Sequence, residues 1–447
     1  MTFLDRSAAQ RIVDQTLAEA RKLGGAEAAV ALTATRAANT RFARNEITST
    51  GDSQNTALDV RVAYGQRQAS VSTNQIDPAS LREAVRRAGA LARLAPENPE
   101  HMPLLGPQTF PASAARYDDA TAVLDAGARA RAAARAIAAA AEGQVDVAGF
   151  FEHEASLSIL GTTAGLRAAS LVTEAELSMT ARTPDGTGSG WAGRSAIRAA
   201  ELDAGALARV AVDKGVRSQK PRRLEPGRYT VVLEPAAVGE LLRFLSMALS
   251  ARNADEGRSF FARPGGGSKI GDKIFHDGVT LTSDPADALA PADSFDGDGQ
   301  PVAATTWIEN GVVTNLYYTR YWAAKQGKKP MGAPSRRHLH GGSAASIEEL
   351  VRGVDRGVLV THFFYIRMLD PQTLVATGLT RDGVFLIDKG EIVGPVQNFR
   401  FNESPVKMLA NADAMTRETV RTPAAPELRV PAIRTSDFNL ASISEAV

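Results

Sequence analysis

Two proline-containing segments constrain the fold of this chain more than any other feature, because they divide it into three parts. Residues 96–111 contain five prolines, a density that prevents a helix and disfavours an interior strand. Residues 218–227 form a shorter basic segment with two further prolines. At roughly 150 residues per domain, 447 residues leave room for about three domains. We therefore expect an N-terminal domain at 1–95, a middle domain at 112–217 and a C-terminal domain at 226–447.

The composition excludes several classes of protein. The chain has no Cys, which rules out disulfides, Cys-based zinc or iron–sulfur sites and a Cys nucleophile, and it has only six His. Its net charge of +1 argues against a general nucleic-acid binder. Asp5 and Arg6 interrupt the apolar stretch that a secretory signal needs, and no run approaches the ~18 apolar residues of a membrane span. We expect a cytoplasmic protein that binds neither nucleic acid nor membrane.

The spacing of apolar residues predicts an α+β protein. Helical periodicity alternates with β-rich segments in the first two parts, so we expect an N-terminal α/β unit and a middle α/β unit. The predicted helices are 7–23, 120–141, 203–215 and one beginning at Pro78, and the predicted strands are 28–35, 40–47, 57–64, 145–160 and 165–183.

The third part is predicted to be mostly β. It opens with a strand at 229–233 and a helix from Pro235 to about Ser250. Residues 307–313 and 386–392 resemble each other, each with a Gly-containing turn between apolar strands, and we expect similar hairpins in one sheet. Residues 357–368 are apolar on both faces, which predicts a central strand.

Two histidine motifs are candidates for chemistry. His153-Glu154 begins as a zinc-protease helix does, but Leu157 and Ser158 occupy both positions of the second His, so we expect a solvent-facing strand pair. His338 and His340 would share one strand face, with His362 a conceivable third ligand. No carboxylate lies at an informative spacing from them, and exposed histidines in a basic loop are the simpler interpretation.

Several segments, in the same order, resemble the TldD/PmbA (TldE) family, once described as modulators of DNA gyrase and now regarded as metalloprotease components. None is diagnostic singly, but together they span almost the whole chain. They are residues 25–27, 41–47, 60–65 and 69–74 in the first part, and 226–233, 295–299, 308–311 and 380–387 in the third. The resemblance implies a TldD/PmbA-like fold.

The zinc motif of that family is absent from this chain. In the catalytic TldD branch, the helix after the strand that matches residues 229–233 carries His-Glu-x-x-x-His, and a Cys near the C-terminus completes the site. Alignment through Leu241-Leu242 places Arg243 and Ala248 at the His positions and Phe244 at the Glu position. A guanidinium, a methyl group and a benzyl ring cannot bind zinc or act as a general base. We assign no catalytic residue, no metal ligand and no cofactor to this chain.

The resemblance therefore implies a pseudoenzyme of the metal-free TldE/PmbA branch. TldE-type chains pair with a zinc-bearing TldD subunit, and the pair trims peptides and unfolded segments, including microcin precursors and an antitoxin. Residues 307–308 and 377–381 diverge from the ordinary TldE pattern, which suggests a separate metal-free subgroup. An extended peptide would bind by strand addition. Candidate groove contacts are Arg320, Tyr321, Arg336, His338, His340 and Arg381.

Two alternatives from other classes remain open at this point. The chain could be a stand-alone hydrolase with a different site, built from His338, His340 and His362. It could also be a homodimeric binding protein for peptides or small molecules, with neither metal nor TldD partner. For the homodimeric binding protein we expect no zinc at all, whereas in a heterodimer the TldD-type homologue would carry the zinc.

Overall fold

The computed structural model describes residues 4–445 and begins with one long antiparallel sheet. Its strand order is β3-β2-β1-β4-β5-β6, and β1 pairs with β4 from Ala29 opposite Thr162 to Phe42 opposite Gly149. The N-terminal and middle units thus share a sheet, whereas the sequence suggested two separate ones. The strands are β1 (Glu27–Ala43), β2 (Glu46–Tyr64), β3 (Arg67–Thr73), β4 (Asp146–Thr162), β5 (Arg167–Arg182) and β6 (Ser189–Ala196).

The turn between β1 and β2 corrects one predicted strand. Arg44 and Asn45 have φ angles of 51° and 60°, as the two central residues of a type I′ hairpin turn require. The predicted strand 40–47 therefore contains the turn, and the three expected strands are two long ones. The turn lacks the Asn-Gly or Asp-Gly pair that usually marks this geometry, which explains why the sequence did not indicate it.

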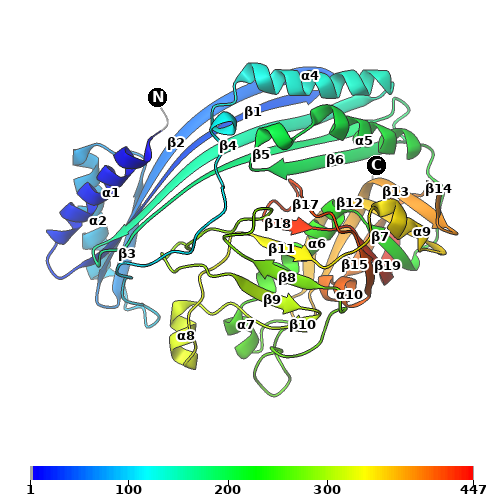
Figure 1. The fold of residues 1–447 in the computed structure, drawn as a ribbon. Helices are drawn as coiled ribbons and strands as arrows, with labels where there is room; N and C mark the ends of the chain where they lie inside the picture. Colours follow the sequence, from blue (N-terminus) through cyan, green and yellow to red (C-terminus); the bar gives the residue numbers. More distant parts are fainter. Residues whose placement is uncertain (1–3, 446–447) are drawn as a thin grey trace.

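The helices cover one face of this sheet in two pairs. Figure 1 shows the sheet curving over the β-rich remainder of the chain, with α4 and α5 on its outer side and α1 and α2 at its far end. Even-numbered residues of β1 and odd-numbered residues of β4 enter both helix-covered cores, so the two pairs share a face. An Asp caps each N-terminus of α1 (Arg6–Arg21), α2 (Pro78–Leu94), α4 (Ala126–Glu142) and α5 (Ala204–Arg217), with the short α3 (Asp119–Ala122) and η1 (Ala199–Glu201) between them.

Under α4, the same face of the sheet is covered by a buried arginine side chain, that of Arg129. The Arg129 side chain is fully buried, donates to Nε2 of His153 at 3.2 Å and pairs with Asp52 at 3.2 Å. His153 is 1% exposed, so the prediction of a solvent-facing pair is wrong for His153 and correct for the exposed Glu154. Burial, aided by the Arg129 charge, lowers the pKa of His153. A neutral imidazole here serves as a hydrogen-bond acceptor in the core.

The C-terminal part consists of two sheets around a common core. The first has the strand order β10-β9-β8-β11-β18-β17. In the second, β12 pairs with both β7 and β13, which closes β12, β7, β19, β15 and β13 into a barrel. The strands are β7 (Gly227–Leu233), β8 (Thr280–Ser283), β9 (Thr305–Glu309), β10 (Val312–Val313), β11 (Arg337–His340), β12 (Arg356–Asp370), β13 (Val375–Asp388), β14 (Glu391–Pro395), β15 (Asn398–Glu403), β16 (Ala412–Met415), β17 (Val420–Arg421), β18 (Leu428–Val430) and β19 (Ile433–Ser444).

Helix α6 (Pro235–Ala248) packs between these sheets and is largely apolar, with Leu241, Leu242 and Leu245 fully buried. The remaining helices are short: α7 (Ala251–Asp255), α8 (Arg320–Gln326), α9 (Ile347–Arg352) and α10 (Pro405–Ala410). No helix within residues 4–445 is long and apolar enough to cross a membrane. The mixed α+β fold with a mostly β C-terminal part is confirmed.

Two expectations for the C-terminal strands are corrected. The similar hairpins at 307–313 and 386–392 form β9–β10 and β13–β14, which belong to different sheets. The strand predicted at 357–368 is central only in its first half. From Phe364 onward most of β12 is exposed, because β7 pairs with it only at residues 357–360.

Replacement of Arg129 by Met should lower the free energy of unfolding by about 2–3 kcal/mol, because Thr40, Thr50 and the Leu124 carbonyl also lose a charged donor. Chemical denaturation would measure the difference. Arg131→Met is the matched control, since Arg131 is exposed on the same helix. Equal losses in the two variants would contradict this role for the buried guanidinium.

Candidate functional site

A pocket of about 470 Å³ lies between α6 and the exposed half of β12. Much of its wall is apolar, and part of that wall faces solvent: Met247 is 76% exposed, Tyr365 65% and Phe364 44%. Exposed apolar side chains gathered around a pocket are typical of a binding site. The charged lining residues are Glu240, Arg243, His362 and Arg367.

The pocket contains two of the three positions that align with the His-Glu-x-x-x-His motif of the catalytic relatives: Arg243 at a His position and Phe244 at the Glu position. Arg243 pairs with Glu427 at 2.9 Å and donates to the Ala424 carbonyl at 3.1 Å. Phe244 packs against the C-terminal core, and Ala248 is buried in it. These side chains supply no lone pair for zinc, and the positive charge of Arg243 repels a cation. The residues present therefore do not fit the metal of the family.

A buried ion-pair chain forms the floor of the pocket. Nε2 of His362 lies 2.9 Å from Glu240, and Nδ1 lies 3.4 Å from Asp382. The indole of Trp191 on β6 stacks on the imidazole, with ring centroids 4.6 Å apart and planes at 8°. Ser189, also on β6, donates to Asp382. His362 thus connects α6, the barrel and the long sheet.

The two carboxylates decide the protonation of His362. Burial by itself disfavours the imidazolium, but the charges of Glu240 and Asp382 outweigh it and raise the pKa of His362 to about 9. The pKa of Asp382 is lowered in turn; its burial opposes this shift, and the adjacent His362 imidazolium and the hydrogen bond from Ser189 favour it. The Glu240 carboxylate is therefore neutralised by an adjacent cation at neutral pH.

The pocket also exposes an edge of β12. Beyond Val360, no strand of the described chain pairs with β12 on the side opposite β13. Where α6 meets this edge, the Glu240 carboxylate accepts a hydrogen bond from the Phe363 backbone N–H at 2.7 Å, so this N–H has a partner. Tyr365 has a φ of 54°, and the register with β13 shifts between Phe364 and Arg367. The residues further along β12 line the pocket, and within the described chain they have no strand partner on that side.

The candidate groove residues fall in four places. Arg381 lies beside this pocket, with its guanidinium 4.4 Å from the Phe364 ring centroid. Arg320 and Tyr321 line a separate pocket of about 150 Å³ beside the first proline-containing segment, where Arg320 donates to the Pro103 carbonyl at 2.6 Å. The structure does not bring the six residues together.

His338 and His340 lie in β11 rather than in an exposed loop, which corrects the simpler of the two interpretations. His338 lies 2.8 Å from Asp287 and 2.9 Å from Thr419, and His340 lies 3.3 Å from Thr282. His362 has the different partners given above. Within residues 4–445, no three His, Cys, Asp or Glu side chains are grouped so that they could hold a metal ion.

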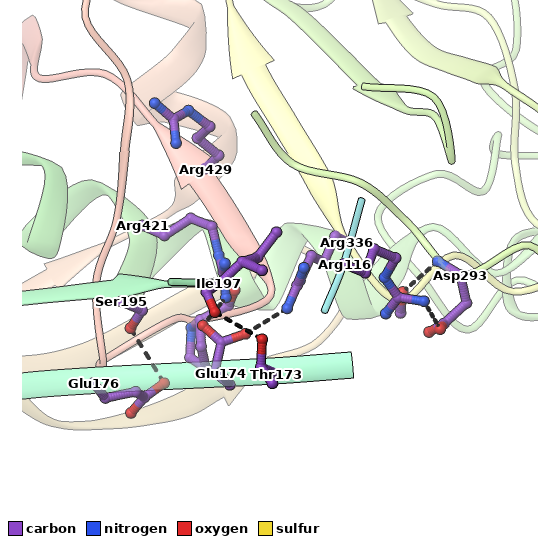
Figure 2. Close-up of polar contacts among 12 residues, drawn as sticks. Arg116, Thr173, Glu174, Glu176, Ser195, Ile197, Asp293, Arg336, Arg421 and Arg429 are labelled. Atoms are coloured by element: carbon purple, nitrogen blue, oxygen red, sulfur yellow. Dashed lines mark hydrogen bonds and ion pairs between the residues drawn. The ribbon is translucent and has the colours of Figure 1, made fainter. Parts of the chain in front are cut away.

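Arg336 is buried in a polar cluster between the long sheet and the C-terminal part. Figure 2 shows Arg336 and Arg421 both directed at Glu174, with Arg116 on Asp293 beside them. Glu174 and Glu176 project from the face of β5 opposite the helices, and Ser195 donates to Glu176 at 3.2 Å. These contacts join the sheet to the remainder of the chain and leave Arg336 little freedom to bind a ligand.

Sequence reasoning missed Glu240, Trp191 and Asp382. Glu240 is the only charged residue between Pro235 and Leu242, an isolated carboxylate in an apolar helix, and that signal was available. The stacking of Trp191 on His362 depends on a contact between β6 and β12, which are far apart in the sequence, and no local pattern indicates it.

Comparisons with known proteins agree with this architecture. Residues 226–442 match the PmbA/TldA metallopeptidase C-terminal domain, and residues 28–92 match PmbA/TldA metallopeptidase domain 1. A protein of Methanothermobacter thermautotrophicus named metalloprotease is 28% identical over 226 residues, 47% of each chain. An uncharacterized protein of Methanocaldococcus jannaschii is 34% identical over 108 residues, 24% of this chain and 25% of its own. The chain thus matches less than half the length of these relatives.

Solved structures show the same fold over nearly the whole chain. TldE from Thermococcus kodakarensis superimposes with a TM-score of 0.86 at 18% identity, covering 96% of this chain and 100% of that one. A Thermotoga maritima protein described as a modulator of a DNA gyrase gives 0.83 at 18% identity, covering 96% and 99%. The fold and the matched domains define a protein of the PmbA/TldA metallopeptidase architecture. Specifically, this chain belongs to the PmbA/TldD family.

The charge on His362 should make stability depend on alkaline pH. Its pKa is about 6.5 when unfolded and about 9 when folded, so the stabilisation is complete below about pH 6.5 and is lost as pH rises through 9. This shift corresponds to about 3 kcal/mol. Unfolding followed from about pH 6 to pH 10 should show that decline in the wild type and a flatter profile in His362→Gln. His276→Gln, at an exposed His, is the control and should keep the slope of the wild type. If His362→Gln showed the same dependence of stability on pH as His276→Gln, the raised pKa of His362 would be contradicted.

Glu176 should have the opposite effect. Burial first, and then the neighbouring carboxylates of Glu174 and Glu152, raise the pKa of Glu176 to about 7. The folded state favours the protonated form, so stability should decrease as pH rises from about 4.5 through 7. Glu176→Gln should raise the melting temperature by about 1–2 °C near pH 8 and hardly change it near pH 5. A variant that melts below the wild type at pH 8 would refute this.

Proposed function

We propose that this chain is a non-catalytic, peptide-binding subunit that associates with a zinc-bearing homologue of the same family. One observation carries the proposal: the helix position of the expected catalytic pair is occupied by Arg243, bound to Glu427, and by Phe244, packed on the core. Membership of a metallopeptidase family supports the link with proteolysis, and the loss of ligand chemistry on α6 supports a role other than catalysis.

The surroundings of that position support retained peptide binding. A purely structural domain has no need to keep an apolar pocket beside an unpaired strand edge, because such surfaces invite non-specific association. Strand addition at the β12 edge would use main-chain hydrogen bonds and would tolerate many sequences. Zinc, and with it the activation of water, would then come from the partner, and the peptide would lie between the two subunits.

Reconstitution tests this proposal. The chain alone should show no peptidase activity in the presence of Zn²⁺. Mixed with a TldD-type homologue from the same genome, it should elute as a one-to-one complex whose activity on an unfolded protein exceeds that of the homologue alone. The experiment needs mass measurement in solution, elemental analysis and a peptidase assay.

Two results would count against the proposal. Chelator-sensitive activity of the isolated chain would favour a stand-alone hydrolase. Separate elution of the two proteins, with this chain as a stable self-dimer and the homologue fully active alone, would favour a homodimeric binding protein.

A further inference from the structure

We propose that the pocket between α6 and β12 binds the C-terminal end of a peptide, with the last side chain in the apolar wall and the free carboxylate at Arg243 and Arg367. This inference rests on the peptide-binding part of the proposed function. It adds the class of ligand, namely a chain end with an apolar last residue.

The charge of the pocket favours an anion. Among the described residues that line the pocket, Glu240 is the only acidic one, and both of its oxygens are engaged, by the His362 imidazolium at 2.9 Å and by the Phe363 N–H at 2.7 Å. The two arginines at the rim are thus not offset by a carboxylate within the pocket. Glu427, which pairs with Arg243, lies outside the lining.

Both arginines keep donors for a ligand. Arg367 is exposed; it stacks 4.3 Å from the Tyr365 ring centroid and donates to the Ile366 carbonyl at 3.4 Å. Within residues 4–445, no carboxylate lies at ion-pair distance from Arg367. Arg243 uses Nε and Nη1 for Glu427 and Ala424, and its Nη2 has no acceptor in the same part of the chain. A carboxylate is the planar anion that a guanidinium binds best.

The apolar wall adds a second requirement. Phe244, Met247 and Ile366 lie in the same lining as the two arginines, and about 470 Å³ suits one or two residues of a peptide. An apolar side chain and a carboxylate on the same residue occur together only at a C-terminus, since the side-chain carboxylates of Asp and Glu bring no apolar group with them.

The strand edge explains why the ligand should end in this pocket. A peptide that adds antiparallel to the exposed half of β12 runs toward α6, where Glu240 already occupies the Phe363 N–H. Beyond that residue, β7 takes the place of a neighbouring strand, from Val360 to Gly357. The edge available to a peptide is therefore closed at its inner end, one turn of α6 from Arg243, and a chain that continued past this point would lose its hydrogen-bond partners.

Direct binding tests the inference without a partner subunit or an activity assay. The probe is an N-terminally labelled peptide of about eight residues that ends in Ala-Leu, prepared as the free acid and as the C-terminal amide. Fluorescence anisotropy with the full chain should show the acid binding about tenfold more tightly than the amide. Arg367→Gln should remove most of that difference. Arg356→Gln, at an exposed Arg on the same strand but outside the pocket, should leave it unchanged.

A second variant tests the effect of charge on binding at a position where the substitution should not disturb folding. Met247 is 76% exposed, so Met247→Glu should fold normally and should reduce binding of the acid by about tenfold, more than it reduces binding of the amide. Acid and amide of equal affinity, equal effects of Arg367→Gln and Arg356→Gln, or no binding of either peptide would each overturn the inference. Failure of the complex with the TldD-type homologue would leave this result untouched, so the two proposals fail separately.

Discussion

The pairing of β1 with β4 is the constraint on which the rest of the structure depends. It joins segments more than a hundred residues apart, and its register places even-numbered residues of β1 and odd-numbered residues of β4 on one face. All four long helices of the first two units cover that face. Because a strand alternates its side chains strictly, the opposite face then carries Glu152, Glu154, Glu174 and Glu176, of which Glu174 binds two arginines of the C-terminal part. The apolar face contributes to the two cores under the helices. The acidic face contacts the C-terminal part, which has its own core.

That second face is joined by charge as well as by apolar packing, in which Phe295 packs against Leu160 and Leu166. Arg336 and Arg421 both bind Glu174, and Arg116 binds Asp293. Further along, Ser189 and Trp191 of β6 reach Asp382 and His362. The long sheet therefore forms one side of the buried ion-pair chain whose other end, Glu240, lies in the α6–β12 pocket. The His362 imidazolium thus links the packing of the long sheet on the C-terminal part to the ion pairs that form the floor of the pocket.

The sequence allowed most helices and long strands to be predicted, and the reasons are local. Asp77-Pro78 marks a helix start, and apolar residues at a spacing of two mark 145–160 and 165–183. The failures are equally instructive. The turn at Arg44-Asn45 has no glycine, and the apolar sequence of 357–368 cannot reveal that β7 ends its pairing at Val360. His153 was wrongly predicted to face solvent because its buried partner, Arg129, lies 24 residues away in the chain, beyond the reach of a local pattern.

The sequence by itself excluded a zinc site of the family type on α6, because Arg243, Phe244 and Ala248 have no ligand atoms for zinc in any conformation. It also determined family membership and the sequence of elements, which follow from local patterns. Only the tertiary structure decided what that helix faces: a neutralised Glu240, an unpaired edge of β12 and two arginines with donors to spare. The reason is physical. The chemistry of a single side chain is carried by its residue type, whereas burial, charge balance and an open strand edge exist only once distant segments have been brought into contact.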